Sequence, residues 1–72
     1  MTIIDPREIG ARLRELRGDR TLQEVADSVG TTRQAVAGYE DGSYTPQDDV
    51  KIRLAAYYGV PVEQIFFKPE SS

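Results

Sequence analysis

The segment spanning residues 22–41, LQEVADSVGTTRQAVAGYED, spaces its small and apolar residues in a way that restricts the folds open to this chain. Two helices joined by a tight turn need a small side chain where they approach each other, and Ala26 supplies it. The turn needs a residue that tolerates positive φ four positions later, which is Gly30. Val36 then provides an aliphatic side chain that faces back between the helices. The spacing predicts two short helices that meet at a steep angle.

Capping residues and glycines divide the whole chain into short helical segments. Five helices are predicted: between Asp5 and Gly18, between Thr21 and Gly30, from Arg33 to about Glu40 before Gly42, between Pro46 and Gly59, and about Val62 to Phe66. Asp5, Thr21 and Thr32 are the predicted N-caps of the first three. The apolar residues expected to face inward are Ile9, Leu13, Leu16, Leu22, Val25, Ala26, Val29, Ile52, Leu54, Ala55, Tyr58, Val60, Val62, Ile65 and Phe66. No segment alternates like a strand. We therefore expect an all-α, compact five-helix bundle with flexible ends at residues 1–5 and 68–72.

The composition excludes most enzyme chemistry. The 72 residues include no Cys and no His, so thiolate or imidazole metal ligands and a histidine general base are absent. No apolar stretch is long enough to span a membrane, and the first residues do not resemble a signal peptide, so a cytoplasmic location without membrane contact is expected. The net charge is −3, and seven of the nine cationic residues are Arg, whose planar guanidinium can form two parallel hydrogen bonds.

Several segments together resemble one known family. Besides residues 22–41, these are IGARLRELR near the start, YEDGSYTP after the second helix of the pair, and LAAYYGVPVEQIFF near the end. In order and spacing they resemble the Cro/CI-type (XRE-like) helix-turn-helix repressors of phages and bacteria. The resemblance covers residues 9–66 and implies a lambda-repressor-like DNA-binding domain, with its helix-turn-helix motif at 22–41.

The resemblance assigns the segment from Thr32 to Glu40 to the recognition helix, which enters the major groove of DNA. It places Arg33 and Gln34 at the principal base-reading positions. Arg can form two hydrogen bonds with guanine and Gln two with adenine, which agrees with that role.

The next outward face of this helix holds Ala37 and Gly38, which we also expect to contact bases. The family often has a long polar side chain at the position of Gly38. Either the backbone at Gly38 lies very close to DNA, or base reading is concentrated on Arg33, Gln34 and a thymine methyl against Ala37.

Contacts to the DNA backbone are expected from two helix starts and a loop, because amide N–H groups and hydroxyls can hold phosphates without formal charge. The residues expected to make them are Thr21, Leu22, Gln23, Thr32, Ser43 and Tyr44. The family frequently has Gln at the position of Leu22 and basic residues near Ser43 and Tyr44, so these contacts depart from its pattern. Arg20 is expected to compensate by reaching a phosphate.

Other charged and aromatic residues are read as scaffold. Arg17 and Glu40 match a family ion pair that joins the first helix to the recognition helix. Arg12, with Glu8 as its partner one turn earlier, is read as part of a solvated face with Arg7 and Arg14. An exposed Phe67 would mark a surface for self-association.

These features predict a sequence-specific, double-stranded DNA-binding transcriptional regulator of the phage or mobile-element repressor type. A homodimer on a pseudo-palindromic operator is expected, because one recognition helix covers only a few base pairs. No enzymatic activity, metal or cofactor is expected. The alternative is a protein-binding module of the same fold, such as an antitoxin-like or anti-repressor partner, which the acidic net charge favours.

Overall fold

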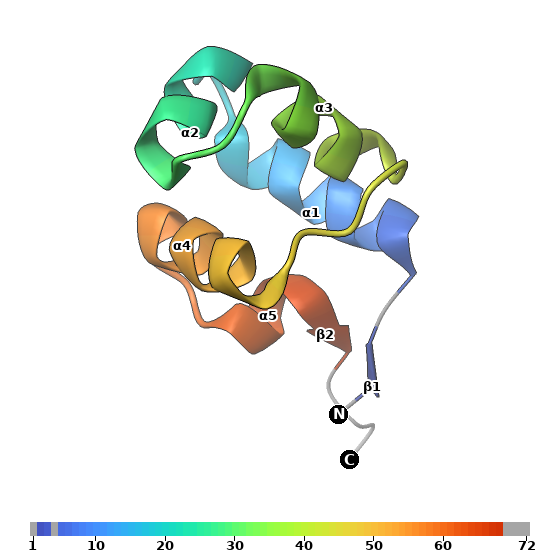
Figure 1. Ribbon diagram of the computed structural model, residues 1–72. Coiled ribbons are helices and arrows are strands. Elements are labelled where there is room, and N and C mark those ends of the chain that lie inside the picture. The colour runs from blue at the N-terminus through green and yellow to red at the C-terminus, as the bar shows by residue number, and fades with distance from the viewer. Residues whose placement is uncertain (1, 4, 69–72) are drawn as a thin grey trace.

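The chain forms a small bundle of helices, closed at one corner by a short pair of strands (Figure 1). The computed structural model describes residues 2–3 and 5–68, and in those residues it contains five helices. The elements are β1 (Thr2–Ile3), α1 (Pro6–Arg17), α2 (Leu22–Val29), α3 (Arg33–Asp41), α4 (Asp48–Tyr58), α5 (Val62–Phe66) and β2 (Phe67–Lys68). The predicted all-α, five-helix architecture is confirmed.

Side-chain caps at the first three helices explain where those helices begin. Asp5, Thr21 and Thr32 each accept a hydrogen bond from an amide nitrogen two or three residues further on, at 2.8, 3.0 and 3.0 Å. Each bond satisfies one of the amides that the first turn of a helix leaves unpaired. Short polar residues in the sequence therefore set the boundaries that the motif requires.

The core lies where the helices meet around α1. In Figure 1, α2 and α3 occupy the upper part and α4 and α5 the lower part, with α1 between them and in contact with α3 and α5. The buried apolar residues are Ile9, Leu13, Val25, Ala26, Val29, Val36, Tyr39, Leu54, Ala55, Ile65 and Phe66. Because every described helix contributes to this cluster, the position of α3 depends on the whole bundle.

The prediction that Ile52 faces the core is wrong, because Ile52 is 61% exposed. Leu54 and Ala55 are buried. Residues two positions apart in a helix point about 200° apart around its axis, so Ile52 cannot share the face of Leu54. The inward stripe is continued instead by Lys51, whose side chain is only 15% exposed and whose Nζ lies 5.7 Å from the centroid of the Phe66 ring.

The helices α1 and α3 approach each other closely at Gly10, a residue that the sequence does not single out. Gly10 is buried, and a Cβ there would overlap with the backbone carbonyl of Glu40. A glycine inside a helix ordinarily weakens it, so its presence here is explained by the packing. Gly10 allows the two helix backbones to touch.

The two strands β1 and β2 pair in antiparallel fashion, with Thr2 opposite Lys68 and Ile3 opposite Phe67. The sequence does not predict this pair, because two residues are too few to show alternation. Of the ends predicted to be flexible, residues 1, 4 and 69–72 lie outside the described residues.

Candidate nucleic-acid interface

The N-terminus of α3 is open to solvent and carries the two predicted base-reading residues. Thr32 caps the helix, accepting from the amide of Ala35 at 3.0 Å, and Arg33 and Gln34 follow directly with exposed side chains. Val36 and Tyr39, further along the same helix, face the core. The helix therefore presents its first turn outward while its inner face holds it to the bundle.

The turn between α2 and α3 is fixed by the glycine that the motif predicts. Gly30 adopts the left-handed conformation, with φ of 76° and ψ of 37°, and its amide bonds to the carbonyl of Ala26. The amide of Thr31 donates to the same carbonyl at 2.9 Å. A residue with a Cβ is strained in this conformation, so the angle between the two helices depends on Gly30.

The N-terminus of α2 holds three of the predicted backbone-contacting residues. Thr21 and Gln23 are exposed, and Leu22 is half-buried against the core. The amide nitrogen Nε2 of Gln23 donates to Oδ1 of Asp27 at 2.9 Å. The side chain of Gln23 therefore has a partner within its own helix. The amide groups of the first turn and the hydroxyl of Thr21 can donate to an anion at this end.

Gly38, which was expected to contact bases, is covered by the protein itself. It is buried, because the ring of Tyr44 lies directly against it: a Cβ at Gly38 would overlap with ring carbons of Tyr44. Tyr44 itself is 60% exposed. A loop side chain therefore occupies the outward position above the glycine, an arrangement that the sequence analysis does not foresee. The alternative in which Arg33, Gln34 and Ala37 read the bases stays a prediction. Ala37 beside it is half-buried, and Ser43 in the loop is exposed.

The predicted ion pair between α1 and α3 is confirmed. The Nε of Arg17 lies 2.6 Å from Oε2 of Glu40, whose side chain is only 4% exposed. The hydrogen bond that Arg17 donates to Glu40 raises the pKa of Arg17 above its usual value. Arg14 lies at the edge of the pair, with its Nε 3.9 Å from Oε1 of Glu40. Because a nearly buried carboxylate needs a charged partner, this pair fixes the recognition helix against α1.

Arg20, which was expected to reach a phosphate, has its guanidinium engaged within the protein. Its guanidinium lies 5.4 and 5.7 Å from the ring centroids of Tyr57 and Tyr58 in α4, and its Nη1 donates to the carbonyl of Leu16 at 3.0 Å. Burial raises the pKa of Tyr58 to about 12. Arg20 therefore closes the end of α1 against α4.

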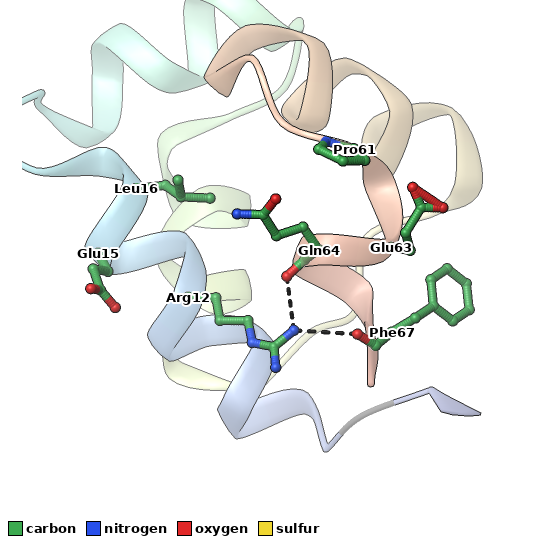
Figure 2. Close-up of a pocket in the computed structure, with 7 residues that line it drawn as sticks. All are labelled: Arg12, Glu15, Leu16, Pro61, Glu63, Gln64 and Phe67. Carbon is green, nitrogen blue, oxygen red and sulfur yellow. Dashed lines mark hydrogen bonds between the residues drawn. The ribbon is translucent and has the colours of Figure 1, made fainter. Parts of the chain in front are cut away.

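A shallow groove of about 570 Å³ lies between α1 and α5, and it contains another arginine whose place differs from the sequence interpretation (Figure 2). The Nη1 of Arg12 donates to the carbonyls of Gln64 and Phe67, at 2.8 and 3.3 Å, so Arg12 joins α1 to the end of α5 instead of forming part of a solvated face. Phe67 is half-buried at the rim. The residues that line the groove come from α1 and from the segment 61–67, with none from α2 or α3.

Two further features of the described residues bear on function. No group of three or more side chains in residues 2–3 and 5–68 is arranged to hold a metal ion. No helix in the same part of the chain is long and apolar enough to cross a membrane.

A capped pair of short helices meeting at a left-handed glycine, with the second helix exposed at its start, defines a helix-turn-helix protein. The profile of the family described as "Helix-turn-helix domain" matches residues 8–65. The chain therefore belongs to the helix-turn-helix domain family, and the resemblance to Cro/CI-type regulators is confirmed.

Individual relatives agree with this assignment. The transcriptional repressor RstR of the cryptic phage CTXphi, from Vibrio cholerae, is 31% identical over 64 residues, which are 86% of this chain and 58% of RstR. This chain thus spans less than two thirds of that relative's length. The restriction-modification controller protein C.AhdI from Aeromonas hydrophila is 28% identical with a TM-score of 0.79, covering 86% of this chain and 97% of its own. The SOS-response repressor LexA from Eubacterium rectale, at 17% identity and a TM-score of 0.82, shares the fold over 94% of this chain and 74% of its own.

Proposed function

We propose that this protein is a transcriptional regulator that binds a specific double-stranded DNA sequence. The observation that carries the proposal is the pair Arg33 and Gln34, exposed at the capped start of α3. In the major groove, Arg can bond to O6 and N7 of guanine and Gln to N6 and N7 of adenine. Ala37 lies on the same face one turn further on.

Phosphate contacts in this proposal come mainly from groups without formal charge. The starts of α2 and α3 present unpaired amides, and the side chains of Thr21, Thr32 and Ser43 are exposed around them. Helix starts and hydroxyls can hold phosphate oxygens. This supply of neutral donors explains how a chain with a net charge of −3 could bind DNA.

The regulator is proposed to act as a homodimer on a pseudo-palindromic operator, in the manner of a phage or mobile-element repressor. Two recognition helices related by a two-fold axis read half-sites about 34–36 Å apart. The segment from α4 to β2 is the proposed contact between subunits, since Ile52 is 61% exposed and Phe67 lies half-buried at the rim of the groove. This role places the protein in the cytoplasm with the DNA and requires no enzymatic activity, metal or cofactor.

Selection of bound duplexes from a random pool tests the proposal directly. The expected result is one enriched motif with two symmetric halves about one helical turn apart. Arg33→Ala should weaken binding to that motif by about 1–3 kcal/mol and relax the preference at one base position in each half. Arg14→Ala, which removes a charged side chain that is 66% exposed on α1, is the matched control and should leave the preference unchanged. A pool with no enriched motif would overturn the proposal.

The acidic net charge favours one other candidate, a protein-binding module of the same fold. The same variants separate the two functions. A protein partner that copurifies with the chain, combined with DNA affinity that Arg33→Ala does not change, would favour the protein-binding module.

A further inference from the structure

The outward face of α3 continues beyond Gln34 with a side chain that does not belong to the helix. Gly38 lies one turn after Gln34 on the same face, since residues four apart in a helix are neighbours on its surface. The ring of Tyr44 covers Gly38 and remains 60% exposed. Tyr44 therefore occupies the place where a side chain of residue 38 would stand.

The backbone fixes Tyr44 to the residue that its ring covers. The carbonyl of Gly38 accepts hydrogen bonds from the amides of three consecutive residues: Gly42, Ser43 at 2.9 Å and Tyr44 at 3.2 Å. Oδ1 of Asp41 accepts from the amide of Ser43 at 2.8 Å. Hydrogen bonding by the side chain of Ser43 and, to a lesser degree, by its amide lowers the pKa of Asp41. The loop thus leaves the helix along a defined path, and the ring is positioned before any ligand arrives.

The fit between the two residues requires a glycine. A Cβ at Gly38 would overlap with ring carbons of Tyr44, so any other residue would push the ring off the helix. Glycine in a helix interior costs about 1 kcal/mol relative to Ala. The packing of the Tyr44 ring against Gly38 explains why a glycine is found at position 38 despite this cost.

We propose that Tyr44, seated on Gly38, is a specificity-determining residue whose ring contacts the 5-methyl group of a thymine next to the base read by Gln34. This inference rests on the proposed function and adds the partner chemistry of one further side chain. The thymine methyl is the apolar group that a base edge offers in the major groove, and an exposed aromatic ring is suited to cover it. The ring takes the place of the long polar side chain that family members often carry here.

The test uses the motif obtained by selection. At one position of the half-site at a time, thymine is replaced in both halves by deoxyuridine, which lacks only the methyl group. Burying one methyl group changes a binding constant about four-fold, so a symmetric replacement in both halves should weaken the intact protein about fifteen-fold at one position. Tyr44→Ala should lose the same factor on the thymine duplex and should not distinguish thymine from uracil at that position.

Two further variants separate this contact from other roles of the ring. Tyr44→Phe keeps the ring and should retain the discrimination between thymine and uracil. If the hydroxyl instead bound a phosphate, Tyr44→Phe would weaken all sequences equally, which would overturn the proposal. Gly38→Ala displaces the ring and should lose the discrimination as Tyr44→Ala does, while the double variant should be no weaker than either single one.

Thermal unfolding shows whether the variants remain folded, and Gly38→Ala should remain folded because Ala favours the helix. A clear selected motif that Tyr44→Ala reads unchanged would overturn this inference and leave the proposed function standing. An intact protein with no sequence preference would overturn both.

Discussion

Arg17 and Glu40 form an ion pair with 2.6 Å between Nε and Oε2, and the side chain of Glu40 is only 4% exposed. The pair links the end of α1 to the last turn of the recognition helix. The guanidinium of Arg17 also donates to the carbonyl of Arg20 at 2.7 Å, so one side chain joins α1, the loop after it and α3. Since α3 presents its opposite end to solvent, the orientation of the proposed reading face depends on this contact.

Arg17→Met should therefore destabilise the fold by about 2–4 kcal/mol, because it leaves the carboxylate of Glu40 buried without its main partner. Urea unfolding followed by circular dichroism measures this loss. Arg14→Met is the control, since the Nε of Arg14 is 3.9 Å from Glu40 and its side chain is 66% exposed. It should cost less than about 1 kcal/mol. Equal losses for both variants would contradict the role given to Arg17.

Gly10→Ala should destabilise the fold although Ala is the better helix former. The new methyl group would overlap with the carbonyl of Glu40, and overpacking of this kind costs about 1–3 kcal/mol. The control is Ala11→Gly at the neighbouring exposed position, where only the helix propensity changes, by about 1 kcal/mol. A Gly10→Ala protein more stable than the parent would show that α1 and α3 can separate freely.

Stability should fall in alkaline solution as Tyr58 ionises. Burial raises its pKa from 10.0 to about 12, so the folded state holds this proton more tightly than the unfolded state does. The contribution is therefore complete below pH 10 and is lost as the pH rises towards 12. Urea midpoints measured between pH 9 and pH 12 should fall less steeply for Tyr58→Phe than for the parent. Parallel curves would indicate that Tyr58 ionises as readily in the folded protein.

The affinity for the selected duplex should decrease with salt more gently than for a basic repressor. Each phosphate neutralised by a cation contributes about −0.9 to the slope of log K against log salt. The chain has nine Lys and Arg residues against twelve Asp and Glu residues, and Arg17 and Arg20 are already engaged within the protein. Fluorescence anisotropy over a range of salt concentrations measures this slope. A value near about −10 would mean that charged residues carry many more phosphate contacts than proposed.

The fold was predictable from local chemistry, because its boundaries are set by residues that act on their own helices. The caps Asp5, Thr21 and Thr32 and the left-handed Gly30 lie where the sequence predicts them. Ile52 was placed wrongly, because an apolar residue at the edge of a periodic pattern can face either way and only the neighbouring helices decide.

Apart from the Arg17–Glu40 pair, which the family resemblance implied, the features that depend on the meeting of distant segments were not predicted. Arg12 bonds to carbonyls more than fifty residues away, and Gly10 is explained only by the carbonyl of Glu40. The covering of Gly38 by Tyr44 was also missed, although a glycine in the middle of a recognition helix is a signal that some other group fills its place. Whether Arg33, Gln34 and the other expected contacts bind DNA remains a prediction.

The glycine under the tyrosine has a consequence for altering the DNA preference of this domain. A longer side chain at residue 38 cannot simply be added to read a new base, because the ring already stands there. Retargeting at this position therefore requires two coordinated substitutions, one at 38 and one at 44. Libraries that vary only the helix should keep returning the parental glycine.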